Sequence, residues 1–239
     1  MMRRTLQQLG FLIVLSALCS SAGAESLIEK LLRVAGLTAA PGEMRGPDGG
    51  ARGSGDIWTV NANGSGRIAL TSGGGYRSPI FAPAGDYIYA LKADTLMRIP
   101  AGGGAAQAML TAAGVIKLVG FDGSNANALI VLTDRGSAPL SELSLSDGKI
   151  VALAPDANTG AEQMLLTQIR GDDRTYRNAK LYLHTETKRG ISREIEWTDV
   201  YLRRGSQPSM NVSACDGVNC MQPALSPDGR RVAFVKADD

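Results

Sequence analysis

Ionisable side chains are most densely clustered in one predicted loop, the Gly-Asp-Asp-Arg sequence at 171–174. Paired carboxylates such as Asp172 and Asp173 can carry out acid–base catalysis or bind Ca²⁺. Arginines on both sides of the pair, among them Arg174, instead favour a loop held together by salt bridges. Because loops on a rigid scaffold often carry binding functions, we interpret Asp172 and Arg174 as candidate contacts for a partner.

His184 is the single histidine of the chain, and it lies in the apolar–polar alternation from Leu181 to Thr185. A histidine can act as a general base, but covalent catalysis also needs a nucleophile beside it. The chain contains neither the G-x-S-x-G sequence of a nucleophile elbow nor the Gly-Lys-Ser/Thr sequence of a P-loop. The sequence therefore predicts a histidine on a strand surface, no catalytic residue and no cofactor.

Cys215 and Cys220 are separated by four residues. In an oxidising compartment such a pair is expected to form a disulfide that closes a short loop. A zinc site would need further cysteine or histidine ligands, which the chain does not supply nearby. We therefore predict a disulfide here and no metal.

The N-terminus has the pattern of a secretory signal peptide. Two arginines precede an apolar run at 9–18, and small residues then lead to Ala24, where cleavage is expected. The run is too short to cross a bilayer core of about 30 Å as a helix. An alternative interpretation is that Cys19 is the lipid-anchored cysteine of a bacterial lipobox motif, but Leu18 stands where that motif has a small residue. We predict an exported periplasmic protein without a transmembrane segment after cleavage.

Export changes the charge balance. Removal of residues 1–24 takes away two arginines and no acidic residue, which leaves 23 basic and 23 acidic side chains. A neutral chain has no overall attraction to nucleic acid or anionic lipid. We therefore expect no nucleic-acid partner, and a periplasmic or envelope protein as the ligand.

Three segments follow one another along the chain. Residues 25–37 have apolar positions at helical spacing, and 38–55 are rich in glycine and proline, so 25–55 is expected to be a short helix and a linker. From Asp56 to Asp239, short apolar runs alternate with turn residues. This pattern indicates an all-β domain, namely a sandwich, barrel or propeller.

An internal repeat favours the propeller. Residues 79–90 align without gaps with 223–234, and weaker copies surround Gly123 and Gly171. The equivalent glycines Gly85, Gly123, Gly171 and Gly229 are separated by 38, 48 and 58 residues. These spacings are close to the length of one four-stranded propeller blade.

The repeat also resembles a known family. Residues 56–71 read D-I-W-x-x-N-x-N-G-S-G-x-x-x-L-T, and 223–234 contain S-P-D-G before a strand. Together they resemble the WD40-like repeat of the TolB family of periplasmic β-propellers. This resemblance implies the fold more than the function, because many functions use such propellers.

The turn residues of the repeat have a structural interpretation. Pro83 and Pro227 fix φ, Gly85 and Gly229 supply positive φ, and Asp228 can accept hydrogen bonds from nearby backbone N–H groups. The first copy has no aspartate at the position of Asp228. We therefore predict that Asp228 stabilises its turn.

In blades of this family the S-P-D-G turn joins the first two strands, and the D-I-W and L-T strands come third and fourth. Here the order implies that the C-terminal strands pair with the N-terminal ones to complete one blade. We predict a propeller of about four four-stranded blades with this closure between the ends. The chain could be a small closed propeller, a piece of a larger one, or a subunit of an assembly, and the separate N-terminal α/β domain of the family is not recognisable.

The function predicted from these observations is a non-catalytic scaffold that binds a protein or another envelope component. Trp197 lies in a charged stretch, so it is the better tryptophan candidate for an exposed contact. One alternative is an enzyme or carbohydrate-processing propeller with a polar site in its central funnel. Another is a truncated fragment of a larger TolB-like protein.

Overall fold

A computed structural model describes residues 53–122, 125–134, 140–153, 174–176, 179–189 and 194–237. Every regular element in these ranges is a β-strand, so the all-β prediction is confirmed. In the same ranges, no helix is long and apolar enough to span a membrane. The predicted signal peptide, the helix at 25–37 and the acidic pair at 172–173 lie outside the described residues.

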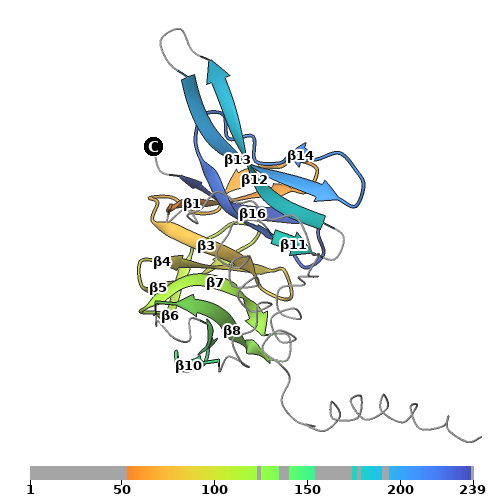
Figure 1. The fold of residues 1–239 in the computed structure, drawn as a ribbon. Helices are drawn as coiled ribbons and strands as arrows, with labels where there is room; N and C mark the ends of the chain where they lie inside the picture. The colour runs from red at the N-terminus through yellow and green to blue at the C-terminus, as the bar shows by residue number, and fades with distance from the viewer. Residues whose placement is uncertain are drawn as a thin grey trace, which may run out of the picture.

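Antiparallel strands form three sheets, one of eight strands and two of four (Figure 1). We divide the eight-stranded sheet where a single residue pair joins its two halves, and we call the resulting groups units I to IV. Unit I combines both ends of the described chain: β15 (Cys220–Leu225), β16 (Arg231–Ala237), β1 (Gly55–Asn61) and β2 (Ile68–Ala69). Unit II contains β3 (Tyr76–Phe81), β4 (Tyr87–Lys92), β5 (Thr95–Pro100) and β6 (Gln107–Thr111). Unit III contains β7 (Val115–Asp122), β8 (Asn125–Thr133), β9 (Leu140–Ser144) and β10 (Ile150–Ala152). Unit IV contains β11 (Arg174–Tyr176), β12 (Ala179–Arg189), β13 (Glu194–Arg204) and β14 (Met210–Asn211).

The two ends of the described chain meet in unit I. Strand β1 pairs antiparallel with β16, and Trp58 lies opposite Phe234. The pairing predicted between the D-I-W strand and the strand after the S-P-D-G turn is therefore observed. Units I and II are joined through the pair Gly55 and Tyr76 into one eight-stranded sheet, and none of the sheets closes on itself.

Three apolar clusters lie between neighbouring units. One joins units I and II around Ile57 and Ile88, a second joins II and III around Leu91 and Leu129, and a third joins IV and I around Phe234. The units therefore form a row in the order III, II, I, IV, which Figure 1 shows from β10 to the β12–β13 hairpin. Within the described ranges, no such cluster joins III directly to IV.

Burial on both faces explains the apolar strands in the middle of this row. Along β4, Ile88 belongs to the cluster shared with unit I, and its neighbour Tyr89 belongs to the cluster shared with unit III. Successive side chains of a strand point to opposite faces, so such a strand must be apolar at almost every position. The same holds for β16, whose Phe234 and Val235 belong to different clusters.

The two best repeat copies form equivalent turns. Gly85 and Gly229 have φ values of 74° and 71°, where a Cβ would be strained. In the second copy, Ser226 Oγ donates to Asp228 Oδ1 at 2.6 Å, and the backbone N–H of Arg230 donates to the same oxygen at 3.0 Å. These bonds lower the pKa of Asp228 from its ordinary value.

Candidate functional site

The β12–β13 hairpin is the most prominent projection in Figure 1. Its two strands pair over their full length, from Ala179 opposite Arg204 to Arg189 opposite Glu194. Because directly opposed residues share a face, Leu181, Val200 and Leu202 lie on the side that packs into the core shared with unit I. The opposite side, which we call the aromatic face, carries four ring side chains: Tyr182, His184, Trp197 and Tyr201.

The rings of the aromatic face contact one another. Tyr182 and Tyr201 are stacked with centroids 5.7 Å apart and planes at 30°, and His184 meets Tyr201 edge-on at 5.2 Å. The Tyr201 hydroxyl donates a hydrogen bond to the Glu186 carboxylate. This bond and partial burial raise the pKa of Tyr201 to about 12.

These rings are only partly covered. Tyr182, Trp197 and Tyr201 are half-buried, and His184 is exposed. Farther along the same face, Ile195 is 38% exposed. Such partly exposed tyrosine and tryptophan side chains are typical of the residues that dominate binding interfaces.

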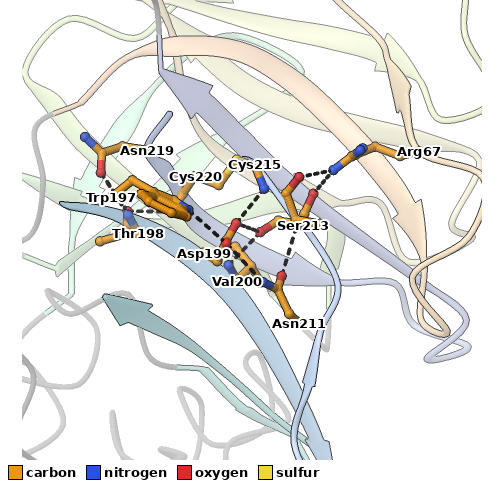
Figure 2. Close-up of a disulfide and its surroundings, with 11 residues drawn as sticks. Arg67, Trp197, Thr198, Asp199, Val200, Asn211, Ser213, Cys215, Asn219 and Cys220 are labelled. Carbon is orange, nitrogen blue, oxygen red and sulfur yellow. Dashed lines mark hydrogen bonds between the residues drawn. A yellow bond between two sulfur atoms is a disulfide. The ribbon is translucent and has the colours of Figure 1, made fainter. Parts of the chain in front are cut away.

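A buried carboxylate holds the base of the hairpin, as Figure 2 shows. Asp199 is 2% exposed. Each of its two carboxylate oxygens accepts two hydrogen bonds. Oδ2 accepts from Trp197 Nε1 at 3.1 Å and from Asn211 Nδ2 at 2.9 Å. Oδ1 accepts from Ser213 Oγ and from the backbone N–H of Cys215, both at 2.7 Å.

The electrostatics of Asp199 indicate a structural role. Burial by itself raises the pKa of this carboxyl, but the four hydrogen bonds outweigh burial and hold the pKa below its ordinary value. A carboxylate that accepts four hydrogen bonds has all of its lone-pair sites occupied. We conclude that Asp199 fixes its neighbours, including the Trp197 indole.

A disulfide joins Cys215 to Cys220, with Cα atoms 6.3 Å apart. The loop that it closes is tied to β13, because Thr198 donates from its backbone N–H to Asn219 Oδ1 at 2.9 Å and from its hydroxyl to the Cys220 carbonyl at 3.0 Å. From the other side, Arg67 donates to the carbonyl of Ser213 (Figure 2). The loop after β14 therefore supports the hairpin beneath Trp197.

Of the three predicted partner contacts, Trp197 lies on the aromatic face. Asp172 lies outside the described residues, and Arg174 is described only as the backbone partner of Leu181 in β11. The sequence interpretation did not single out Tyr182 and Tyr201. Their signal was the alternation on both strands, which places one tyrosine on each at the same face.

A second polar arrangement lies between β15 of unit I and β3 of unit II. Ser78 and Gln222 occupy equivalent positions before the prolines of the two repeat copies, and their φ values are 53° and 52°. The N–H of Ser78 donates to Gln222 Oε1 at 2.5 Å, and Gln222 Nε2 donates to the Gly53 carbonyl at 2.9 Å. Both polar atoms of the Gln222 amide therefore form hydrogen bonds, and the bond with Ser78 links the two repeat copies.

In the described part of the chain, no group of three or more His, Cys, Asp or Glu side chains is arranged to hold a metal ion. The prediction of no metal or cofactor stays a prediction, because part of the chain lies outside these residues.

Comparison with known proteins gives only distant structural similarity. No family model matches the chain, and no curated protein sequence matches it. The structure is similar to that of a putative TolB from Agrobacterium tumefaciens, with 14% identity and a TM-score of 0.35, over 74% of this chain and 59% of that one. It is also similar to the apo AtxE2 isopeptidase, with 16% identity and a TM-score of 0.25, over 72% of this chain and 31% of that one. The chain thus spans less than two thirds of either structure.

Proposed function

We propose that this chain is a non-catalytic, periplasmic binding scaffold whose four units are arranged as propeller blades. The single observation that supports binding is the aromatic face of the hairpin, where Tyr182, Trp197 and Tyr201 are half-buried beside an exposed histidine. Such side chains supply large contact area with few rotatable bonds, so they lose little conformational entropy on binding. A protein of the cell envelope is the partner that we propose.

The support beneath the aromatic face strengthens this proposal. The indole N–H of Trp197 is held by Asp199, and the Tyr201 hydroxyl is held by Glu186. Their orientations are therefore set before a partner arrives. A preorganised surface binds more tightly than a mobile one, because the cost of ordering it has already been met in folding.

Site-specific crosslinking in the periplasm tests the proposal. A photoreactive amino acid is introduced in place of Ile195, on the aromatic face, or in place of Met109 in β6, as a matched control. Both positions are 38% exposed. We expect one crosslinked envelope protein from position 195 and none from position 109.

Binding of that identified protein is then measured with purified variants. Tyr182→Ala and Ile195→Glu should each weaken binding, by about tenfold or more for a central contact, while Met109→Ala should not. Both hairpin variants leave the four hydrogen bonds of Asp199 in place. Equal crosslinking from both positions, or unchanged affinity of the two hairpin variants, would disprove binding through this face.

A further inference from the structure

Among the described residues, no strand lies beside one edge of the hairpin beyond Leu181. Strand β11 pairs only with the beginning of β12, at Ala179 to Leu181. From Tyr182 to Arg189, β12 pairs with β13 on its other side, and no strand of the described chain pairs with this edge. The unpaired N–H and C=O groups of such an edge are a template for another extended strand.

The residues along this edge alternate in a way that complements a second copy of the same strand. We propose that two copies of the chain pair antiparallel through β12, with the two-fold axis at Thr185. This register places His184 opposite Glu186 of the second copy, and Tyr182 opposite its Lys188. Each pair occurs twice by symmetry. The arrangement therefore gives two opposite-charge or hydrogen-bonded pairs and two cation–π pairs, with Thr185 opposite Thr185.

Neighbouring registers are less favourable. A two-fold pairing must keep each face of the sheet continuous, so its centre can move only to another residue of β12. A centre at Glu186 opposes two like-charged carboxylates. A centre at His184 would place Lys188 against Lys180, where the edge is already paired with Thr175 of β11. A centre at Thr187 retains attractive pairs but uses a shorter part of β12. The charges of the opposed side chains and the length of paired strand therefore favour the register centred at Thr185.

The side chains at this edge are accessible for such a contact. His184, Thr185, Thr187, Lys188 and Arg189 are all exposed. Glu186 accepts one bond from Tyr201, through Oε1, and a carboxylate accepts bonds at two oxygens. Pairing would join two hairpins into one four-stranded sheet, with both aromatic faces side by side. The inference stands on the strand edge and holds whether or not the aromatic face binds an envelope protein.

Charge variants at the symmetry axis test this dimer. Sedimentation of the purified protein over a concentration series should show a monomer–dimer equilibrium. Thr185→Lys places two like charges opposite each other and should raise the dissociation constant by about tenfold or more, as should Thr185→Glu. An equal mixture of the two variants should restore dimers. Thr111→Lys, at an exposed threonine in β6, is the matched control and should dimerise like the unmodified protein.

A crosslink provides an independent readout. Directly opposed residues of an antiparallel pair have Cα atoms about 4.5 or 5.5 Å apart, and both distances suit a disulfide. Thr185→Cys should therefore give a covalent dimer under mild oxidation, whereas Thr111→Cys should remain monomeric. A monomer at all concentrations, or dimers that are unaffected by Thr185→Lys and not trapped by Thr185→Cys, would overturn the proposal.

Discussion

Replacement of Asp199 by asparagine tests the most specific claim about the hairpin base. Asparagine keeps the shape of the side chain, but one acceptor oxygen becomes an NH₂ group that faces two donors. Hydrogen bonds to charged groups contribute about 1.5–3 kcal/mol, and each buried donor without a partner costs about 1–3 kcal/mol. Of the four donors to Asp199, two lose their acceptor. We expect the free energy of unfolding to fall by about 3 kcal/mol at neutral pH.

The effect should depend on pH in a defined direction. The hydrogen bonds hold the folded-state pKa of Asp199 below its ordinary value. A carboxyl of this kind stabilises the fold above its unfolded pKa of about 3.9, and the contribution is lost as pH falls through the folded-state pKa. The difference in stability between Asp199→Asn and the unmodified protein should therefore be full near neutral pH and shrink in acid.

Urea unfolding of both proteins, followed by circular dichroism at a series of pH values, measures this difference. Asp147→Asn is the control, because Asp147 is an exposed turn carboxylate whose pKa is lowered by its bond with Ser144. It should leave the unfolding midpoint nearly unchanged. A loss of stability below about 0.5 kcal/mol for Asp199→Asn, or a loss that persists undiminished in acid, would refute the stabilising role of the Asp199 carboxylate.

Three further outcomes follow from the structure. Replacing Cys215 and Cys220 by serine should lower the free energy of unfolding by about 2 kcal/mol, measured by urea unfolding, because their loop is short. Phe234→Ala should cost about 3–5 kcal/mol in the same assay, since its ring is fully buried between units I and IV. Tyr201 should keep its proton beyond the ordinary tyrosine range, to about pH 12, in an ultraviolet titration, and Glu186→Gln should lower that pKa. Because the folded-state pKa is raised, the stability linked to it is present below pH 10 and is lost as pH rises through 12.

The resemblance to repeat blades predicted that the two ends of the described chain would meet. The D-I-W strand around Trp58 and the strand containing Phe234 were expected to pair from the order of repeat fragments, and they do. Strands such as those at 87–91 and 129–133 are also visible in the sequence, because their residues are apolar on both faces. The strand positions could be predicted because each depends on the composition of a single short segment, whereas the pairing followed from the strand order that the family resemblance implies.

The hairpin and its base were much harder to foresee. In this region the sequence has short strand-like runs at 180–184 and 199–202, yet β12 and β13 each extend to eleven residues. Residues 185–189 at the end of β12 are all polar or charged, so no apolar alternation marks them. In β13, Ile195 and Trp197 do alternate with polar residues, and this is the signal that could have indicated the longer strand. The donors to Asp199 at Asn211, Ser213 and Cys215 come from a loop beyond the next turn, and no local pattern connects them.

Because unit I lies between units II and IV, its strand β16 stabilises two of the three cores. Strand β16 contributes Phe234 to the core with unit IV and Val235 to the core with unit II. Losing this strand would therefore damage two of the three cores and would separate the hairpin from the rest of the described chain. Since successive side chains of one strand serve different cores, a defect in either core is transmitted to the other through the backbone of β16. Units II, I and IV should consequently unfold together, and the hairpin should lose its aromatic face in the same transition.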